Sequence, residues 1–528
     1  MRGLSRITVV VAVVAAALGG SAPTGASRQP PLWVRHVVNF PGGISVGPRS
    51  RLAALEARAS AGGPGTASPL AGADVQMNAD CDPPRPQNET SVAYNPNDPS
   101  NAVAAANDYC GDGFWIGFTF DGGSTWGSVF KDPKLSTGAR CFGSDPSVVY
   151  SLRDAAFYLA TLCFSPFDPS SEVQVWKSTD GGRTWTDSFA PAVAISNIRA
   201  DGSIDASVFY DKELLAVDND PASARFGRLY LTFIKFHMVG ASGRSDYCPV
   251  QLASTDASPA DPADWTWSHT AVVPDAPGAK GLGPSANQWA IPVVDDVGGL
   301  DVAYVIEDCN TGVDRGLFFT RSTDGGATFS SPVRIDEPGR FADNPNRQDL
   351  LPAKHARLPI SPSLAFDPTR DRLLFAYQNN VNRGTSGADI SLQVSDDFGA
   401  TWSDPSVIAV TPSGAPAPND QFFPWLAVDP TGTVHAIWYD NRNDPGNKLI
   451  ETFVGVSKDG GATWTNVDVS DVAWNPDASF FSCGCFIGDY NGLAASGSVT
   501  YPVWTDGRTT PGQPSGQTDI FTDPQVSS

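Results

Sequence analysis

The sequence predicts an all-β fold, a β-propeller of four-stranded blades, with seven blades favoured and six left open. Three observations lead to this fold class. One eight-residue motif recurs five times, and seven stretches of the chain repeat one order of strand-like segments. In addition, 51 glycines and 44 prolines among 528 residues indicate many turns and few long helices. Repeats of this kind are typical of a closed ring of small sheets.

The recurring motif is an Asp box, Ser/Thr-x-Asp-x-Gly-x-Thr-aromatic. Its five copies are Thr119–Trp126, Ser178–Trp185, Ser322–Phe329, Ser395–Trp402 and Ser457–Trp464. The Asp side chain can accept hydrogen bonds from nearby backbone N–H groups, and the Gly supplies a positive φ. The aromatic side chain is large enough to wedge between neighbouring sheets. Each copy therefore predicts a β-hairpin corner with its own packing anchor.

The repeated unit has an apolar first strand, a second strand, a third strand after a polar loop, and a fourth strand after the Asp box. The seven units span about 89–130, 144–190, 211–270, 287–335, 359–410, 420–470 and 485–524. Each unit exposes apolar faces that only its neighbours can cover, which predicts closure of the ring. The seventh unit has only three strands, and we expect Trp33–Phe40 to supply the fourth.

The chain divides into three regions. Residues 1–26 are predicted to be a signal peptide, because Arg2 and Arg6 flank the start of an apolar run at Ile7–Leu18. Residues 27–80 are predicted to be a partly disordered leader that donates the closing strand. Residues 81–528 are expected to form a single Asp-box propeller. We therefore expect a secreted, extracellular protein.

The eight cysteines support this compartment, because an even number of cysteines in an exported chain favours disulfides. We predict pairs between neighbours in the sequence: Cys81–Cys110, Cys141–Cys163, Cys248–Cys309 and Cys483–Cys485. A zinc site is the alternative for the last pair, since Cys-x-Cys closes a tight ring.

The formal net charge is −22. Such an acidic chain has no electrostatic reason to bind nucleic acid or an anionic membrane. After the amino-terminal run, no segment is long and apolar enough to cross a bilayer. We expect a monomer without a cofactor, with a structural calcium ion left open because carboxylates suit hard cations.

Strand alternation places the second-to-third loops, and the connections into each first strand, on the face opposite the Asp boxes. These segments surround the mouth of the central channel, where propellers bind ligands on a rigid frame. Chemically distinctive residues fall at these positions: Glu89, Asp145, Asp211, Gln288, Glu307, Asp308, Arg383, Asp420, Tyr439, Asp440, Arg442, Asp489, Tyr490, Asp506 and Arg508. They suggest a ring of carboxylates with three arginines along one arc.

A structural role is the alternative for several of these residues. Asp440 and Arg442 are two apart, as are Asp506 and Arg508, so each pair shares one face of a strand and could fasten adjacent blades. Carboxylates at the start of first strands could likewise cap turns.

Asp boxes on a propeller resemble the sialidase (neuraminidase) superfamily, also called the BNR-repeat proteins, from about Glu89 to Thr522. The resemblance implies a glycosidase with an arginine clamp for the substrate carboxylate, a tyrosine nucleophile with a carboxylate base, and an Asp acid/base. By position, Tyr490 or Tyr439 would be the nucleophile, Glu307 or Glu89 its base, and Asp145 or Asp489 the acid. Arg383, Arg442 and Arg508 would form the clamp, and Glu89, Asp420, Asp440 and Asp506 would line the site.

The sequence departs from that family in two respects. Sialidases carry an Arg-Ile-Pro motif before the first Asp box, whereas the similar Arg357-Leu358-Pro359 comes late in this chain. Sialidases also have six blades. The sequence thus predicts a sialidase-like glycoside hydrolase that acts on extracellular glycans. The alternatives are a non-catalytic carbohydrate- or protein-binding propeller, in which the arginines pair with Asp440 and Asp506, or a polysaccharide lyase.

Overall fold

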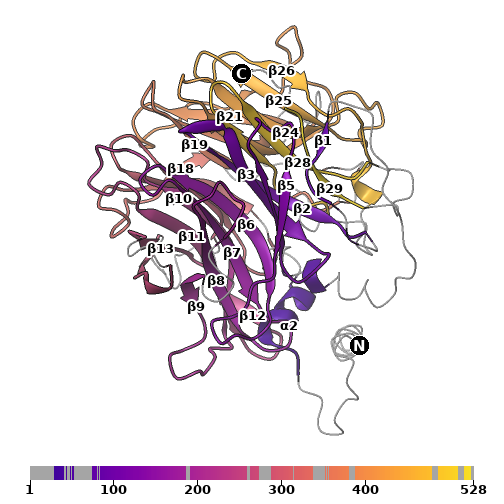
Figure 1. Ribbon diagram of the computed structural model, residues 1–528. Coiled ribbons are helices and arrows are strands. Elements are labelled where there is room, and N and C mark those ends of the chain that lie inside the picture. Colours follow the sequence, from indigo (N-terminus) through magenta and orange to yellow (C-terminus); the bar gives the residue numbers. More distant parts are fainter. Residues whose placement is uncertain are drawn as a thin grey trace.

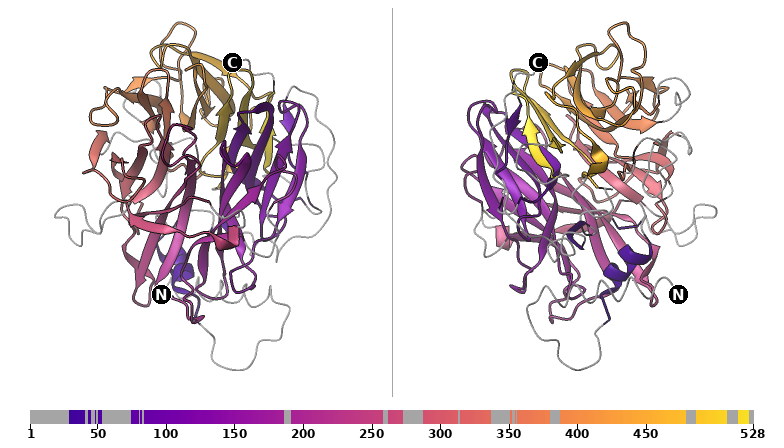
Figure 2. Two further views of the ribbon diagram at one scale, coloured as in Figure 1. Left: turned by 60° about the vertical axis from the view of Figure 1, so that its left-hand side comes forward. Right: turned by 90° about the vertical axis from the view of Figure 1, so that its right-hand side faces the viewer.

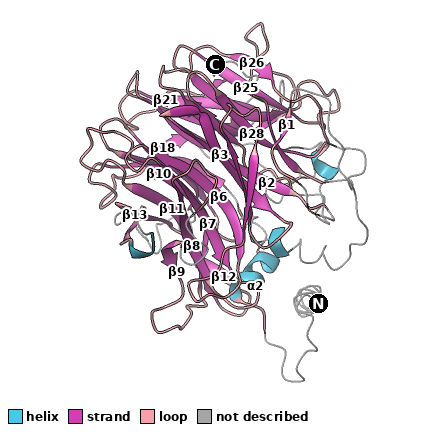
Figure 3. Ribbon diagram, in the orientation of Figure 1, coloured by secondary structure: helices cyan, strands magenta, loops and turns pink. Residues whose placement is uncertain are grey.

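The protein is a seven-bladed β-propeller. The computed structural model describes residues 29–40, 43–44, 48, 50–52, 74–79, 81, 84–185, 191–257, 262–272, 287–312, 314–336, 351, 354, 356–379, 387–478, 486–508 and 517–524. Strands dominate it (Figure 3), and the sheets follow one another around a ring in chain order (Figures 1 and 2). The seven predicted blades are confirmed.

Each of the first four blades is an antiparallel sheet built from consecutive strands. Blade one contains β2 (Gln87–Asn95), β3 (Asp98–Asp108), β4 (Phe114–Thr119) and β5 (Gly127–Lys131). Blade two contains β6 (Phe142–Ser151), β7 (Ala156–Phe164), β8 (Ser171–Ser178) and β9 (Ala192–Ser196). Blade three contains β10 (Val208–Val217), β11 (Leu229–Val239), β13 (Val250–Thr255) and β14 (Ser268–Ala271), with β12 (Arg244–Tyr247) paired to β11. Blade four contains β15 (Asn287–Val294), β16 (Leu300–Glu307), β17 (Asp314–Ser322) and β18 (Val333–Asp336).

The remaining blades complete the ring. Blade five contains β19 (Ser363–Asp367), β20 (Arg372–Asn379), β21 (Asp389–Ser395) and β22 (Ser406–Val407). Blade six contains β23 (Gln421–Val428), β24 (Val434–Asp440), β25 (Glu451–Ser457) and β26 (Thr465–Asp468). Blade seven contains β27 (Gly492–Ala495), β28 (Thr500–Asp506), β29 (Asp519–Thr522) and the amino-terminal β1 (Val75–Gln76). Two short 3-10 helices lie at Pro262–Asp264 and Pro476–Ala478.

Blade seven is closed by a strand from the leader, as predicted, but from a different segment of it. β1 pairs antiparallel with β29, with Val75 opposite Thr522. The prediction that Trp33–Phe40 forms the closing strand is wrong, because Leu32–Asn39 is the helix α2. Its apolar residues Trp33, Val34 and Val37 lie on one helical face, and this spacing suits a helix better than alternation along a strand. The Trp33 ring packs 5.1 Å from the ring of Phe209 in blade three.

The five Asp boxes form the corners that the motif predicts. In the blade-six copy, the Thr463 N–H donates to Asp459 Oδ1 over 2.9 Å and the Thr463 hydroxyl donates to Asp459 Oδ2 over 2.6 Å. The Ser457 hydroxyl also donates to Asp459, and Gly461 adopts φ 94°. The same three bonds to the Asp recur in the other four copies. These corners lie at the ends of the third strands, so the starts of the first strands lie on the opposite face.

Serines on the first strands join adjacent blades around the channel. The Ser91 hydroxyl accepts a hydrogen bond from the Val148 N–H, and the Ser147 hydroxyl accepts one from the Leu215 N–H, each over 3.0 Å. Ser363 repeats this contact with Leu426 between blades five and six over 2.9 Å. The exposed N–H edge of one first strand is therefore satisfied by the preceding blade, which makes the wall of the channel rigid.

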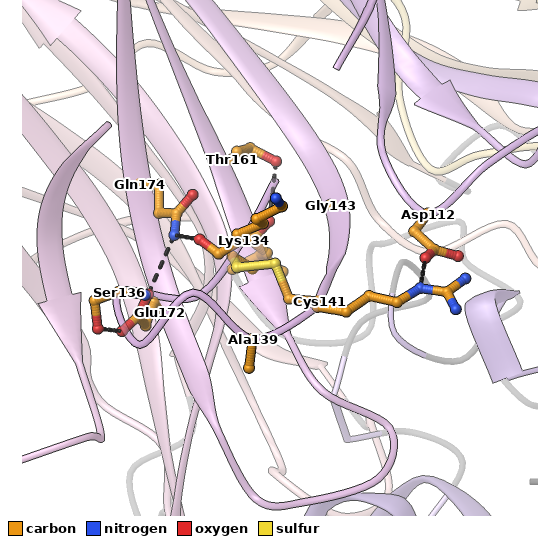
Figure 4. Close-up of a disulfide and its surroundings, with 12 residues drawn as sticks. Asp112, Lys134, Ser136, Ala139, Cys141, Gly143, Thr161, Glu172 and Gln174 are labelled. Atoms are coloured by element: carbon orange, nitrogen blue, oxygen red, sulfur yellow. Dashed lines mark hydrogen bonds and ion pairs between the residues drawn. A yellow bond between two sulfur atoms is a disulfide. The ribbon is translucent and has the colours of Figure 1, made fainter. Parts of the chain in front are cut away.

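Three of the four predicted disulfides are confirmed: Cys81–Cys110, Cys141–Cys163 and Cys248–Cys309. The fourth predicted pair, Cys483–Cys485, lies outside the described residues, as does the predicted signal peptide. In Figure 4 the Cys141–Cys163 bond joins a loop to β7, and this loop also pairs with Asp112 through Arg140. Among the described residues, no helix has the length and apolar character needed to cross a bilayer.

Candidate functional site

A repeated bulge brings one side chain from each of five blades to the mouth of the channel. The pairing of the first and second strands shifts at the same place in five blades, and the first unpaired residue has a positive φ of 55–60°. These residues are Glu89, Asp145, Lys212, Trp289 and Phe423. Ser361 and Tyr490 stand two residues before the first paired residue of blades five and seven, which is the corresponding position. We call these seven residues the channel ring.

The contacts of Lys212 show that the channel ring converges on the channel axis. Its ammonium lies 3.9 Å from Glu89 Oε1 in blade one and 4.0 Å from Asp145 Oδ2 in blade two. It also lies 4.2 Å from the centre of the Trp289 ring in blade four and 3.9 Å from that of Tyr490 in blade seven. A residue of blade three can reach four other blades only across the axis. Aromatic faces and carboxylates both stabilise this ammonium, which is only 2% exposed.

Glu89 and Asp145 form a buried carboxyl pair that is held by Asn107 of the second strand of blade one. The Asn107 amide donates to Glu89 Oε2 over 2.5 Å, and its oxygen accepts the Asp145 N–H over 2.8 Å. The Ser144 hydroxyl donates to Asp145 Oδ1 over 2.7 Å. One amide side chain therefore fixes the Glu89 carboxyl group of blade one and the bulge of blade two.

Burial raises the pKa values of three groups in this cluster. Burial, followed by the charge of Asp145, raises the pKa of Glu89 well above its usual value, although Lys212 opposes the shift. The same two causes raise the pKa of the neighbouring Glu213, which is 1% exposed. Burial, followed by the charge of Glu89, raises the pKa of Tyr490. The raised pKa values favour the protonated, uncharged form of the Glu89 and Glu213 carboxyl groups.

Arg357 adds a second cation beside the ring. Its guanidinium lies 3.7 Å from Asp489 Oδ2, next to Tyr490 in the sequence, and the Arg357 side chain is 12% exposed. The Arg357-Leu358-Pro359 motif had seemed too late in the chain to contribute, but the ring closure brings it to the mouth. The signal was present in the sequence as Arg-x-Pro, but its late position in the chain argued against it.

A cavity of about 130 Å³ lies one step further along the channel. Its wall includes Ser91, Ser147, Leu214, Ile291, Leu364 and Trp425, which closely follow the ring residues of their blades. The centre of the Trp425 indole lies 6.2 Å from the centre of the Tyr490 phenol. The cavity therefore adjoins the channel ring. This volume far exceeds the roughly 10–15 Å³ that one water requires and is smaller than the pockets of drug-sized ligands.

The structure brings four predicted site residues together: Glu89, Asp145, Asp489 and Tyr490. At blades three, four and six the ring residue differs from the residue singled out in the sequence. It is Lys212 rather than Asp211, Trp289 rather than Gln288, and Phe423 rather than Asp420. The bulge adds a residue that the alternation pattern does not reveal, and an offset by an odd number of residues moves a side chain to the other face.

Two of the three predicted clamp arginines are engaged within the blades. Arg442 donates to Asp440 Oδ2 from Nε over 2.9 Å and from a terminal nitrogen over 2.6 Å. Arg508 lies 2.6 Å from both Asp506 Oδ2 and Asp74 Oδ2, and so it anchors the closing strand β1. This is the pairing expected for a structural role. Arg383 lies outside the described residues.

The other predicted site residues also have structural surroundings. Asp420 accepts the Lys354 ammonium over 2.8 Å and the Ala388 N–H over 2.9 Å, which fastens the start of blade six. The Tyr439 hydroxyl donates to the Thr505 carbonyl over 2.6 Å and is buried in the core. Glu307 is the last residue of β16, a second strand, and is 7% exposed. Among the described residues, no group of three or more His, Cys, Asp or Glu side chains could hold a metal ion.

Solved structures with a similar fold include glycosidases. A Hadza microbial sialidase, Hz136, is 14% identical over 77% of this chain and 75% of its own, with a TM-score of 0.43. Trypanosoma rangeli sialidase in complex with the inhibitor DANA is 14% identical over 74% of this chain and 57% of its own, with a TM-score of 0.42. Penicillium chrysogenum alpha-L-arabinanase complexed with arabinobiose is 13% identical over 72% of this chain and 94% of its own, with a TM-score of 0.43. No protein-family model and no curated protein matches the sequence.

Proposed function

We propose that the protein is a glycoside hydrolase that binds a sugar residue at the channel ring, opposite the Asp boxes. The observation that carries this proposal is the buried Glu89–Asp145 pair, in which Asn107 fixes the Glu89 carboxyl group and burial raises its pKa. Glycosidases need a carboxylic acid that retains its proton at working pH beside a group that stabilises or attacks the anomeric carbon. Tyr490, Asp489 and Lys212 supply charge and nucleophilic oxygen around this pair.

Glu89 is the general acid of the proposed reaction. Its proton passes to the glycosidic oxygen as the bond from that oxygen to the anomeric carbon breaks, so the leaving group departs as an alcohol. The Tyr490 oxygen bonds to the anomeric carbon while its proton moves to the Asp489 carboxylate. Water then attacks the anomeric carbon, gives its proton to Glu89 and displaces Tyr490, which recovers its proton from Asp489.

Lys212 and Asp145 set the electrostatics of these steps. The raised pKa of Tyr490 keeps the phenol protonated until Asp489 accepts its proton. The Lys212 ammonium over the Tyr490 ring stabilises the negative charge that grows on the phenol oxygen. Burial and the Asp145 charge raise the pKa of Glu89, and the same charge stabilises the positive charge that develops on the sugar ring.

The test is turnover of fluorogenic sialoside, arabinofuranoside, glucoside, galactoside and glucuronide by the purified protein. We expect at least one to be cleaved, with a loss of about 10²–10⁴-fold in Glu89→Gln, the usual contribution of a general acid. Glu172→Gln is the matched control. Glu172 is also fully buried, but it lies on β8 and bonds to Ser136, Gln174 and Ser196 away from the ring. Equal activity in Glu89→Gln and wild type would refute the assignment.

A non-catalytic carbohydrate-binding propeller is the second candidate. It is favoured by the pairing of Arg442 with Asp440 and of Arg508 with Asp506, and by ring side chains that are at most 5% exposed. A folded protein that cleaves none of the glycosides but binds one of them in the channel would establish this alternative.

We further propose that the protein is exported and acts on extracellular glycans as a monomer. Three disulfides support this, because such bonds persist in oxidising compartments. Thiol titration of the purified protein before reduction tests this proposal. Free thiols at the six described cysteines would argue against export.

A further inference from the structure

The charges at the channel ring compensate one another. Lys212 lies about equally far from Glu89 and Asp145, at 3.9 and 4.0 Å, and Arg357 lies 3.7 Å from Asp489. Lys212 and Arg357 therefore already face carboxyl groups, and Arg442 and Arg508 are held in the blades. An incoming carboxylate would have to compete with Asp145 or Asp489 for its counter-charge in a region with little water.

Further carboxyl groups lie around these two cations. Burial raises the pKa values of Glu89 and Glu213, which favours their uncharged form, and Asp211 lies close enough to raise the pKa of Glu213 further. The Glu213 oxygens are buried without a hydrogen-bond partner among the described residues. Unpaired buried acids of this kind are suited to the hydroxyl groups of a sugar, which both donate and accept hydrogen bonds.

The walls of the site suit the uncharged face of a sugar ring. Trp289 and Trp425 both pack against Tyr490, at centroid distances of 6.5 and 6.2 Å. Trp425 also lines the cavity of about 130 Å³, together with the apolar side chains of Leu214, Ile291 and Leu364. This space accommodates a single small ring rather than a long polymer.

We propose that the channel ring selects a neutral sugar residue and discriminates against sialic and uronic acids. The inference rests on the proposed function and names its substrate class. The fold resemblance to sialidases had implied an acidic substrate, and the charge balance at Lys212 and Arg357 reverses that expectation.

The first experiment measures binding of arabinobiose, lactose, sialyllactose and glucuronic acid to the wild-type protein by calorimetry, beside the turnover panel. We expect at least one neutral sugar to bind at least tenfold more tightly than either acidic sugar. Tighter binding or faster cleavage of an acidic sugar overturns the inference but leaves the hydrolase proposal intact. Binding of a neutral sugar without any turnover overturns the hydrolase and retains the selectivity. Binding of none of the sugars overturns both.

The second experiment changes the charge balance. Asp489→Asn releases the Arg357 guanidinium, and we expect affinity for sialyllactose or glucuronic acid to rise at least tenfold. Asp440→Asn is the matched control, because Asp440 also pairs with an arginine but lies outside the ring. A rise in both variants, or in neither, contradicts the proposed role of the Arg357–Asp489 pair.

Discussion

Asn107→Ala tests whether amide side chains on second strands position the site. Asn107 is fully buried and contacts Glu89 Oε2 over 2.5 Å and the Asp145 N–H over 2.8 Å. Truncation leaves the N–H of the blade-two bulge buried without a partner, which costs about 1–3 kcal/mol, and removes a hydrogen bond worth about 1 kcal/mol. We expect a loss of about 2–4 kcal/mol in the free energy of unfolding and at least a tenfold loss of glycoside turnover.

Gln378→Ala is the matched control for this prediction. Gln378 holds the bulge of blade six in the same way, accepting the Phe423 N–H over 2.9 Å and donating to the Pro359 carbonyl over 3.0 Å. It contacts no carboxyl group in these bonds, so we expect a similar loss of stability with turnover retained. Guanidinium unfolding followed by tryptophan fluorescence, with turnover of the best glycoside, measures both effects. A change below about 0.5 kcal/mol in Asn107→Ala would refute the energetic argument, and equal turnover losses would refute the functional one.

Three further predictions concern the leader and the closing strand. Arg508→Ala should destabilise the protein by about 3–5 kcal/mol in guanidinium unfolding, because Asp506 and Asp74 then lose their buried counter-charge; an unchanged midpoint would contradict this. Burial raises the pKa of Asp74 from 3.8 to about 6, so the stability it contributes is fully present below pH 3.8 and is lost as the pH rises through about 6. Comparing wild type with Asp74→Asn from pH 4 to 7 isolates this slope, and parallel curves would disprove it. Trp33→Ala removes an indole that packs on Phe209, should cost about 3–5 kcal/mol of packing, and should speed proteolysis near α2 while the blades stay protected; uniform cleavage of leader and blades would contradict it.

Local interactions explain why the fold could be predicted from the sequence. Every hydrogen bond of an Asp box connects residues within eight positions, as between Ser457, Asp459 and Thr463. One short motif therefore specifies the whole corner. The blade count followed from repeating this motif with the strand pattern. The exception was Trp33–Phe40, whose β-branched residues resembled a strand, although its apolar spacing is helical.

The candidate site could be predicted only in part. Glu89, Asp145, Asp489 and Tyr490 were identified from their place before a first strand. Lys212 and Trp289 were missed by one residue, because a bulge changes the facing of a side chain without an unambiguous mark in the sequence. For Arg442 and Arg508, the sequence spacing was compatible with a substrate clamp and with an ion pair inside the blade. Only the contacts in the structure distinguish these two roles.

The amino-acid sequence by itself determined that this chain forms a propeller with Asp-box corners on one face, because turn chemistry and strand alternation act over a few residues. Only the tertiary structure decided which side chains meet at the axis. Closing the ring places Glu89 of the first blade, Lys212 of the third and Tyr490 of the last within reach of one another. Their charges and protonation depend on that shared burial, which no local pattern encodes.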